Sequence, residues 1–575
     1  MEKPNKNIVH IIEKMTLDQK IGAVLTLGFA GTVATSRVFE MIEKYHCGGF
    51  RLTPHGRSAS ANYVDPRTGK TVVSIQNDNG IKKGMPSPQC TAHEYKKLLQ
   101  SLQAVARRRP LGIPLHFSTD QEGGESANCG FSEVQLFPRS MGVRASGDSS
   151  MAFEVSRAVG LQCRAVGITS LHSPNVDVNV DPRNPEICAR SYSDRAEEVA
   201  EYAEQACRGF QAAGMIATAK HFPGRGDSPV DAHFEIPVIT ADWETLWNRE
   251  LLPYRRLIEK NLIPSIMIAH SIYPALDPDC IATVSRKIIT GLLREKMGFQ
   301  GVITTDSMTM GGIATRYGVA TACAMALEAG ADLVLMKSQG SLVEETIGEI
   351  RRFIEEGRIS REELDDKIYR ILSMKYEYGL FHAKTADFEE PEKVLRDPGI
   401  FALSQEAALK SVLVARNLQG YLPLSKEEKV LVIEQADLSR FVNLAYYPGM
   451  LYQNCCRYSN LLSYLETDYT YDEEDLRRID EKIQQYDTII LTSYFTRGRR
   501  SNIDKVRHLA AMRGKKVILV TNTPYELTIP EEADTVIVTF ATTIRNIEVV
   551  AQTIFGEIQP EGEMPVSNHA QARRV

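Results

Sequence analysis

One short segment concentrates side chains that can transfer protons or bind polar ligands: KHFPGRGDSPVDAHFEIP, residues 220–237. Its three prolines and two glycines indicate a loop, because these residues interrupt helices and central strands. Asp231 stands two residues before His233. A carboxylate so placed can orient an imidazole that titrates near neutral pH, which suits general acid/base chemistry. Taken alone, an Asp-x-His pair is more often two solvated loop residues.

A second candidate is Asp306, which directly follows the apolar run GVITT. A carboxylate fixed at the end of a buried strand can attack an electrophilic carbon from a rigid position. The same position also suits a helix N-cap, and the residue alone does not decide between these roles. A glycosidase needs an acid or base on one side of the scissile bond and a carboxylate on the other, roles that His233 and Asp306 could fill.

Eight short apolar runs are expected to position these residues, and helical stretches that often end in glycine separate them. Runs that are apolar on both faces and alternate with helices predict a parallel sheet covered by helices. Eight such units predict a (β/α)8 barrel, whose active site lies at the carboxyl ends of the strands. The runs span residues 21–31, 48–53, 114–124, 170–178, 215–222, 265–271, 301–306 and 331–338.

Ionisable residues stand at the carboxyl ends of several of these runs. A charged group there is costly to bury unless it is paired or faces a cavity. Separate strand or helix caps would explain one such residue, but seven at the same end of successive strands predict a shared cleft. The seven are Asp120, Asp177, Lys220, His221, His270, Asp306 and Lys337.

A second, smaller α/β domain is predicted after the barrel. Four further apolar runs with helices between them favour a doubly wound sheet. We therefore expect a barrel domain over residues 1–380, a linker over 381–402 and an α/β sandwich over 403–575. The segment 54–100 is too long for an ordinary βα loop, so we expect a lid or specificity element over the catalytic face, with a disordered insertion as the alternative.

Composition excludes several classes of function. The net charge of −6 over 575 residues argues against a nucleic-acid binder. No signal peptide and no apolar stretch of membrane-spanning length occurs, and the ten cysteines form no CxxC pair, so we expect a cytoplasmic protein without a membrane partner. The histidines show no HxH or HExxH spacing, and we expect no metal and no cofactor.

The segment 220–237, with DQEGG at 120–124 and GVITTDSM at 301–308, resembles glycoside hydrolase family 3 in its β-N-acetylglucosaminidase branch. ARNLQGYLPL and GEMPVSNH in the second domain are similar to that family as well. The resemblance implies that Asp306 is the nucleophile that forms a glycosyl-enzyme intermediate. It implies that His233 is the general acid/base and Asp231 its partner.

The same resemblance implies a set of sugar-binding residues, namely Asp120, Arg190, Lys220 and His221. We further take three residues as candidate specificity residues, namely Arg225, Arg57 and Met308. The chain departs from the branch in three places. Arg225 stands where the branch usually has histidine, ESANCGF follows DQEGG where arginine is usual, and the segment 54–100 has no clear counterpart. The departures put the substrate in doubt rather than the catalytic residues.

The function implied is a retaining exo-acting enzyme that hydrolyses terminal β-linked N-acetylglucosamine from small saccharides or cell-wall fragments, as in cell-wall recycling. Phosphate in place of water would make it a phosphorylase, and a β-glucosidase or β-xylosidase is a further alternative. A catalytically inactive sugar-binding protein is the alternative of another class, although Asp306, Asp231 and His233 are all present. The expected partner is a small carbohydrate, and the oligomeric state stays open, with a homodimer as one option.

Overall fold

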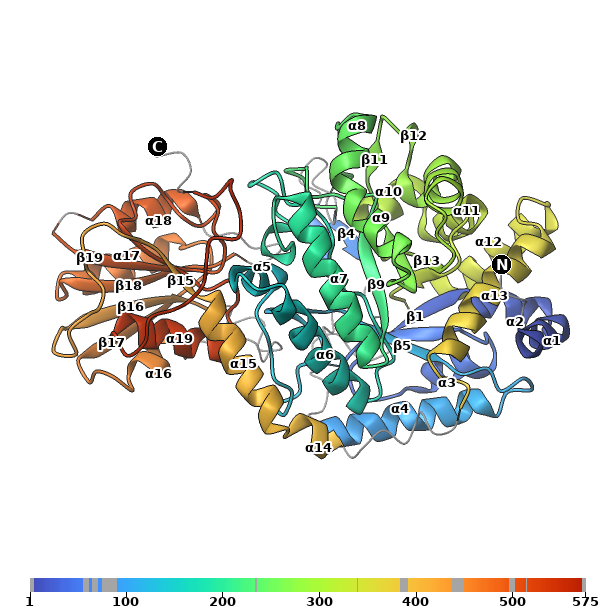
Figure 1. Ribbon diagram of the computed structural model, residues 1–575, viewed down its shortest axis with the longest axis horizontal. Helices are drawn as coiled ribbons and strands as arrows, with labels where there is room; N and C mark the ends of the chain where they lie inside the picture. The colour runs from blue at the N-terminus through green and yellow to red at the C-terminus, as the bar shows by residue number, and fades with distance from the viewer. Residues whose placement is uncertain are drawn as a thin grey trace.

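The chain folds into two bodies that lie side by side along its long axis (Figure 1). We describe it from a computed structural model. The description covers residues 5–54, 90–232, 235–338, 340–382, 391–436, 449–495, 502–512 and 514–570, together with the backbone of 61–64 and 71–74. The larger body, blue to yellow in Figure 1, contains the first sheet, and the smaller one, orange to red, contains the second.

The first sheet has eight strands in the order β13-β10-β9-β8-β5-β2-β1-β14, and every neighbouring pair in it is parallel. A parallel bridge between Thr304 and Leu333 joins the two end strands, so the sheet nearly closes. Each of the eight predicted runs contains one strand of this sheet, which confirms the (β/α)8 barrel. The strands are β1 (Leu25–Ala30), β2 (Gly49–Thr53), β5 (His116–Thr119), β8 (Ser170–Leu171), β9 (Ile216–Phe222), β10 (Ser265–Ile268), β13 (Val302–Thr305) and β14 (Val334–Met336).

Helices between the strands cover the outside of the barrel. In α7, Val199, Ala203 and Phe210 follow the helical period and bury one face against the sheet. Capping boxes fix the starts of α4 and α13. In each, the N-cap side chain accepts a hydrogen bond from the backbone N–H of the third helical residue, and the glutamate at that third position accepts one from the backbone N–H of the N-cap. The covering helices are α3 (Ser36–Glu43), α4 (Ala92–Arg107), α6 (Ser150–Ala165), α7 (Ala196–Ala212), α9 (Leu252–Glu259), η4 (Lys287–Lys296), α11 (Val319–Ala329), α12 (Leu342–Glu355) and α13 (Arg361–Glu377).

Shorter elements decorate both ends of the barrel. Helices α1 (Lys6–Lys14) and α2 (Leu17–Ala23) precede the first strand, and β3 (Ala61–Val64) pairs antiparallel with β4 (Thr71–Ser74) within the segment expected to be a lid. Most of that segment lies outside the described residues, so its role stays a prediction. The remaining elements are β6 (Gln121–Gly123), β7 (Ser126–Ala127), α5 (Ser140–Ala145), η1 (Cys188–Arg190), α8 (Trp243–Thr245), η2 (Leu246–Glu250), β11 (Ile272–Tyr273), β12 (Asp277–Ile281), η3 (Ala282–Val284) and α10 (Gly311–Tyr317).

The second sheet has the order β15-β20-β19-β18-β16-β17, with β15 antiparallel and the other neighbours parallel. Successive residues of β16 enter different apolar clusters, Leu431 and Ile433 on one face and Val430 and Val432 on the other. Burial of both faces confirms the doubly wound domain. Its elements are β15 (Leu413–Asn417), β16 (Val430–Gln435), α16 (Met450–Cys455), β17 (Leu462–Thr467), α17 (Glu473–Ile483), β18 (Thr488–Ser493), α18 (Ile503–Ala510), β19 (Lys516–Thr521), β20 (Thr535–Val538) and α19 (Ile544–Ile554).

Two helices connect the bodies. The segment predicted as a linker, 381–402, contains α14 (Pro391–Leu395) and the first residues of α15 (Pro398–Ser411). Helix α15 runs from the barrel to the second domain in Figure 1 and packs against α5 and α19. The part of the predicted linker that the structure describes is therefore mostly helical from residue 391 on.

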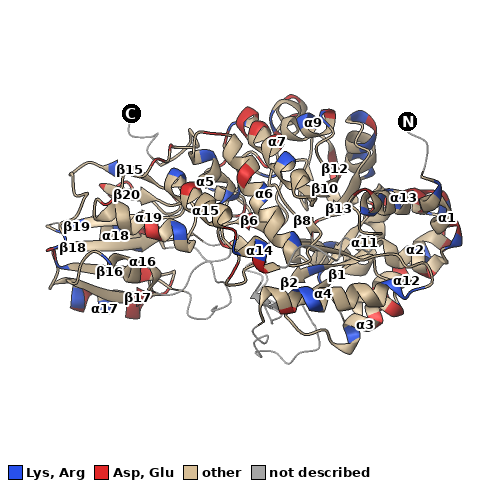
Figure 2. Cartoon of the chain, turned by 60° about the horizontal axis from the view of Figure 1, so that its bottom comes forward, with Lys and Arg blue, Asp and Glu red and all other residues tan. Residues whose placement is uncertain are grey.

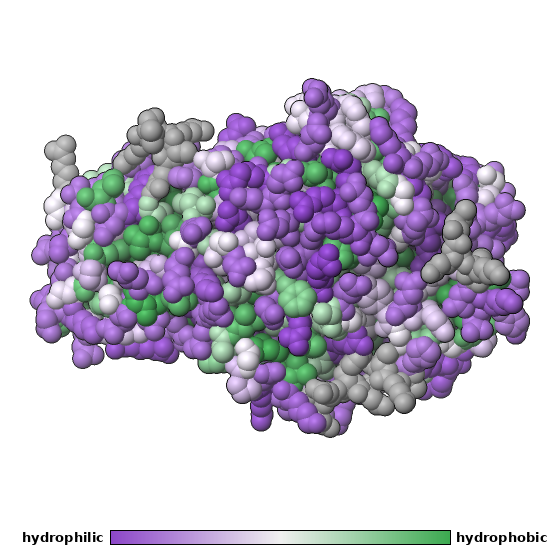
Figure 3. Space-filling view, in the orientation of Figure 1, coloured by the Kyte–Doolittle hydropathy of each residue, from purple (hydrophilic) through white to green (hydrophobic). Residues whose placement is uncertain are grey.

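The surface and the cysteines agree with the composition. Lys and Arg are interspersed with Asp and Glu over both bodies (Figure 2). One face is mostly hydrophilic, with apolar residues gathered mainly on the second domain and in the lower middle of the view (Figure 3). The ten cysteines, all within the described ranges, form no disulfide bond, and only Cys456 is exposed. None of the helices in the described ranges is long and apolar enough to cross a membrane.

Candidate active site

The carboxyl end of β9 brings the first group of predicted residues together. Lys220 Nζ lies 3.2 Å from a carboxylate oxygen of Asp120 and 2.6 Å from one of Glu122. Glu122 in turn forms two hydrogen bonds with the Arg190 guanidinium, at 2.8 and 3.1 Å. Asp120 is also paired with Arg51. Burial favours the neutral carboxyl, but Arg51 and Lys220 outweigh it and hold the pKa of Asp120 well below its usual range.

The second group surrounds the predicted nucleophile. His221 Nδ1 lies 2.8 Å from Asp177, and its Nε2 lies 3.9 Å from Asp306. Arg225 Nη2 lies 3.4 Å from the same Asp306 oxygen. Asp177 also accepts a hydrogen bond of 2.8 Å from the backbone N–H of Arg225. The three sequence-predicted residues Asp306, His221 and Arg225 therefore share one cluster.

Asp306 is held as a carboxylate at the end of β13. Its backbone N–H donates to Ile268, the last residue of β10, and its side chain accepts a hydrogen bond of 2.7 Å from the N–H of Ser307. Burial raises the pKa of this carboxyl, but Arg225 and His221 outweigh that effect and keep the pKa well below its ordinary value. The side chain is 14% exposed, so an ionised oxygen borders open space. An ionised, fixed carboxylate is the state that a nucleophile requires.

His221 is neutral at ordinary pH. Burial and the nearby Arg225 charge lower the pKa of its imidazole to about 4, although Asp177 acts in the opposite direction. The pKa of Asp177 lies below its ordinary value, so that carboxylate accepts the hydrogen of His221 Nδ1. In a neutral ring, Nε2 is then an acceptor on the side that faces Asp306. A sugar hydroxyl could donate to it.

Arg225, which contacts the predicted nucleophile Asp306, also forms an ion pair with Glu186. Their N–O distance is 2.7 Å, and each side chain is 2% exposed. Nε and Nη1 of Arg225 are buried without a hydrogen-bond partner among the described residues. The loop that carries Arg225 can approach the backbone of Val178 only because residue 226 is glycine. A Cβ there would lie 1.8 Å from the carbonyl oxygen of Val178.

The remaining predicted residues are placed less completely. Asp231 is buried, and the next residue, Ala232, donates its N–H to Glu186 at 3.2 Å, which ties the loop to the Arg225–Glu186 pair. Met308 is fully buried in the apolar core of the barrel. His233 and Arg57 lie outside the described residues. The acid/base role of His233 and the specificity role of Arg57 therefore stay predictions.

The two carboxylates that complete these clusters, Glu122 and Glu186, were not among the residues predicted for the site. A signal for Glu122 exists, since it stands two residues after Asp120 and the period of a strand places i and i+2 on one face. Glu186 carries no such signal, because it lies in an irregular segment and meets Arg225 only through the fold. In the part of the chain that the structure describes, no cluster of His, Cys, Asp and Glu side chains could hold a metal ion.

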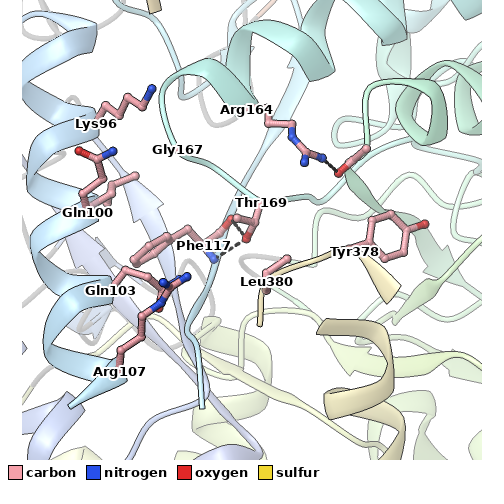
Figure 4. A pocket seen from close by; sticks show the side chains of 12 residues that line it. Lys96, Gln100, Gln103, Arg107, Phe117, Arg164, Gly167, Thr169, Tyr378 and Leu380 are labelled. Atoms are coloured by element: carbon pink, nitrogen blue, oxygen red, sulfur yellow. Dashed lines mark hydrogen bonds between the residues drawn. The ribbon is translucent and has the colours of Figure 1, made fainter. Parts of the chain in front are cut away.

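A separate pocket lies at the opposite end of the barrel (Figure 4). Its empty volume is about 600 Å³, including space open to solvent. Phe117 and Thr169 on its wall stand at the amino ends of β5 and β8, whereas Asp120 follows the carboxyl end of β5. The pocket is therefore distinct from the charged cluster. It is lined by Lys96, Leu99, Gln100, Gln103, Arg107, Phe117, Arg164, Gly167, Thr169, Gly214, Tyr378 and Leu380.

Comparison with known proteins gives a consistent result. The chain is 29% identical over 444 residues to "Beta-hexosaminidase A" of Pseudoalteromonas piscicida, which covers 74% of this chain and 71% of that protein. It is 34% identical over 246 residues to a "Beta-hexosaminidase" of Tolumonas auensis, covering 42% of this chain and 72% of the relative. A glycoside hydrolase family 3 β-N-acetylglucosaminidase from Paenibacillus sp. str. FPU-7 superposes with a TM-score of 0.79 at 27% identity, over 96% of this chain and 99% of that one.

The sequence profile described as "Glycosyl hydrolase family 3 N terminal domain" matches residues 16–374, which is more than half of the chain and contains all the clusters above. The match spans the eight barrel strands, from β1 to β14, and includes Asp120, Lys220 and Asp306. The resemblance inferred from the motifs is thereby confirmed, and the chain belongs to glycosyl hydrolase family 3.

Proposed function

We propose that the enzyme removes terminal β-linked N-acetylglucosamine from small saccharides or cell-wall fragments and retains the configuration at the anomeric carbon. One observation carries the proposal: an ionised Asp306 borders open space at the carboxyl end of the barrel, next to His221 and Arg225. The names of the relatives, β-hexosaminidases and a β-N-acetylglucosaminidase, support the same activity. We further propose that the enzyme acts in the cytoplasm.

In the proposed mechanism Asp306 attacks the anomeric carbon, and a glycosyl ester forms as the bond to the leaving group breaks. His233 donates a proton to the leaving oxygen, and Asp231 stabilises the imidazolium before that transfer. In the second half, His233 accepts a proton from water, which attacks the same carbon and releases Asp306. Two inversions give overall retention.

The sugar would be held by the first cluster. Asp120 is ionised and can accept hydrogen bonds from sugar hydroxyls, whereas Lys220 and Arg190 can donate them. Neutral His221 offers Nε2 as a further acceptor beside the nucleophile. A set of donors and acceptors in fixed ion pairs is preorganised, so little is lost when the sugar binds.

Nitrophenyl glycosides provide the test. We expect the N-acetylglucosaminide to be cleaved with a kcat/KM at least about tenfold above the glucoside and xyloside. Proton NMR of the first product should show the β-anomer before mutarotation. Preferred cleavage of the glucoside or xyloside would assign the β-glucosidase or β-xylosidase activity instead. An inverted product would contradict the mechanism, and binding without turnover would indicate an inactive sugar-binding protein.

A phosphorylase remains a second candidate, supported by Arg225. Its buried Nε and Nη1 lack partners among the described residues and lie on a guanidinium that contacts Asp306, where an acceptor phosphate would need donors. The same assays in phosphate buffer distinguish the two. Accumulation of sugar 1-phosphate, with turnover that rises with phosphate concentration, would establish phosphorolysis. Free sugar alone at every phosphate concentration would establish hydrolysis.

A further inference from the structure

The two domains meet where the sugar-binding loops leave the barrel. One such loop is the β6–β7 hairpin, which follows Asp120 and carries Glu122, and the other is the segment 186–195, which carries Arg190. Both contact loops at the carboxyl edge of the second sheet. We propose that the second domain holds these two loops in position and that Glu125 is the positioning residue through which it acts. This inference rests on the proposed function, because it concerns the same sugar site.

Glu125 leaves the barrel and enters the second domain. One oxygen accepts hydrogen bonds from the backbone N–H and the hydroxyl of Thr542, at 3.0 and 2.5 Å, and from the side-chain amide of Asn522 at 3.4 Å. The other oxygen pairs with Arg139 at 2.6 Å. Burial disfavours the charged form, but Arg139 and Thr542 outweigh it, so the pKa of Glu125 lies below its ordinary value. At position 125, where arginine is usual in the branch, the structure therefore has a carboxylate that links the two domains.

The hairpin has little room to move. A Cβ on Gly123 would lie 2.2 Å from the carbonyl oxygen of Pro138. A Cβ on Gly124 would lie 2.7 Å from the Arg139 side chain and 3.4 Å from Ala541 of the second domain. The tip is thus enclosed by both bodies, and a displaced Glu125 would carry Glu122, three residues earlier, with it. Glu122 is the carboxylate that joins Lys220 to Arg190.

The segment 186–195 is attached to the second domain independently. Cys188 and Ala189, which precede Arg190, belong to the same apolar cluster as Tyr525 and Phe540 of the second domain. Close to this segment, Asn179 donates to the Tyr525 hydroxyl at 2.9 Å. The Arg190–Glu122 pair therefore connects two loops that are each attached to the second domain.

The contact between the segment 186–195 and the second domain contains a strained backbone residue in each domain. Cys188 has φ of +45° and Phe540 has φ of +53°, a region that residues other than glycine rarely adopt. Such strained residues persist where the surrounding packing fixes them, and they cluster near functional sites. The interface between the domains therefore fixes the arrangement of both loops, in addition to burying apolar side chains.

Steady-state kinetics of Glu125→Ala test the proposal. We expect KM for the N-acetylglucosaminide to rise by about tenfold and kcat to change by less than about threefold, because the binding residues shift while Asp306 stays in place. Glu125→Gln keeps the acceptor for Thr542 and should recover part of the loss. Thr542→Val should raise KM less than Glu125→Ala, and the double variant should be no worse than Glu125→Ala alone.

Ile547→Val is the matched control, since Ile547 is fully buried in α19 on the other face of the second sheet and the change removes one methyl group. It should lower the melting temperature and leave KM unchanged. If Ile547→Val raises KM as much as Glu125→Ala does, general destabilisation explains the result and the proposal is wrong. It is equally wrong if Glu125→Ala leaves KM within about twofold of wild type.

Hydrogen exchange separates this inference from the proposed function. Peptides covering residues 121–127 and 186–195 should exchange faster in Glu125→Ala and at the wild-type rate in Ile547→Val. If the wild-type enzyme cleaves none of the glycosides, the proposed function fails, while the exchange measurement still tests whether the second domain holds the loops. Unchanged exchange in both peptides would overturn the inference even if the enzyme is active.

Discussion

A buried lysine at each end of the barrel is held in a different way, although the amino end also has a charged group, the buried Asp332 with Arg294 and Arg370. At the carboxyl end, charged side chains pair with charged side chains from other strands and loops, as Lys220 does with Glu122 and Arg225 with Glu186. At the amino end, the buried Lys375 of α13 donates instead to the backbone carbonyls of Gly48 and Pro114, at 2.7 and 2.8 Å.

The difference separates groups kept for chemistry from groups kept for stability. A buried ion pair often costs about as much in desolvation as it returns, so an array of such pairs is poor at stabilising a fold. Hydrogen bonds to buried carbonyls just before the strands add to the bonding of acceptors that are cut off from water. We therefore expect every substitution at the carboxyl end to reduce turnover, with a loss of stability only where one charge is left without its partner, and substitutions at the amino end to affect stability alone.

The largest effect is expected for Asp306→Asn. The amide keeps the shape but cannot act as the nucleophile, so kcat should fall by about 10⁴-fold or more. The melting temperature should fall only modestly, because the carboxylate stabilises the folded state, as its lowered pKa shows, but the amide fits the same site without burying a charge. Kinetics and calorimetry on the same preparation measure both quantities. Retained turnover would remove Asp306 from the catalytic role, and unfolding would break the contrast between the ends.

Arg225→Met should come next, with a fall in kcat/KM of about 10²-fold. Glu186 would then keep the more distant Arg190, 4.0 Å away, and unfolding should require about 3 kcal/mol less. The double variant Glu186→Met/Arg225→Met should regain part of this stability, since the Glu186 charge is removed with its partner although Asp306 still lacks Arg225, and it should not regain activity. If the double variant stays as unstable as the single one, the pair stabilises the fold and the comparison is too simple.

Lys375→Met should cost about 2 kcal/mol of stability and leave kcat unchanged, because the carbonyls of Gly48 and Pro114 each lose a donor, although that of Gly48 keeps the His116 N–H at 3.2 Å. Burial, with Arg109, lowers the pKa of Lys375 to about 7. Between pH 7 and the ordinary pKa of 10.5, Lys375 is protonated in the unfolded chain but neutral in the folded protein. The free energy of unfolding therefore rises with pH over this range. Denaturant unfolding at several pH values should show the rise in wild type and its loss in the variant. The exposed Lys44→Met is the control, and an equal loss there would contradict the assignment.

The smallest effect is expected for Glu250→Gln. This carboxyl lies beneath the loop at Gly224, and burial raises its pKa to about 7 although Arg249 opposes the shift. The folded protein holds the proton of Glu250 more tightly than the unfolded chain does, so protonation of this residue stabilises the fold. The stabilisation is complete below about pH 4.5 and is lost as the pH rises through 7. The variant should show a stability–pH slope smaller by up to about one proton between these values. Glu244→Gln, at an exposed position on α8, should leave the slope as it is.

The strands were predictable because their signal is local. All eight barrel runs contain a strand, and Asp306, Lys220 and His221 were predicted at strand ends from the sequence alone. Glu186 and the destination of Glu125 were not predictable, since their partners, Arg225 and Thr542, are far along the chain and no periodic pattern links them. The expected linker carries no sequence signal for α14 and α15, because these helices are stabilised by packing against α5 and α6.

The single exposed cysteine allows the distance between the two domains to be measured. Of the ten cysteines, seven are buried, Cys90 and Cys280 are partly covered, and Cys456 alone is exposed, just after α16 in the second domain. A maleimide dye should therefore attach first at that position without any substitution. Paired with a second label introduced on the outer surface of the barrel, such a dye would let energy transfer follow whether the two bodies separate while the enzyme works.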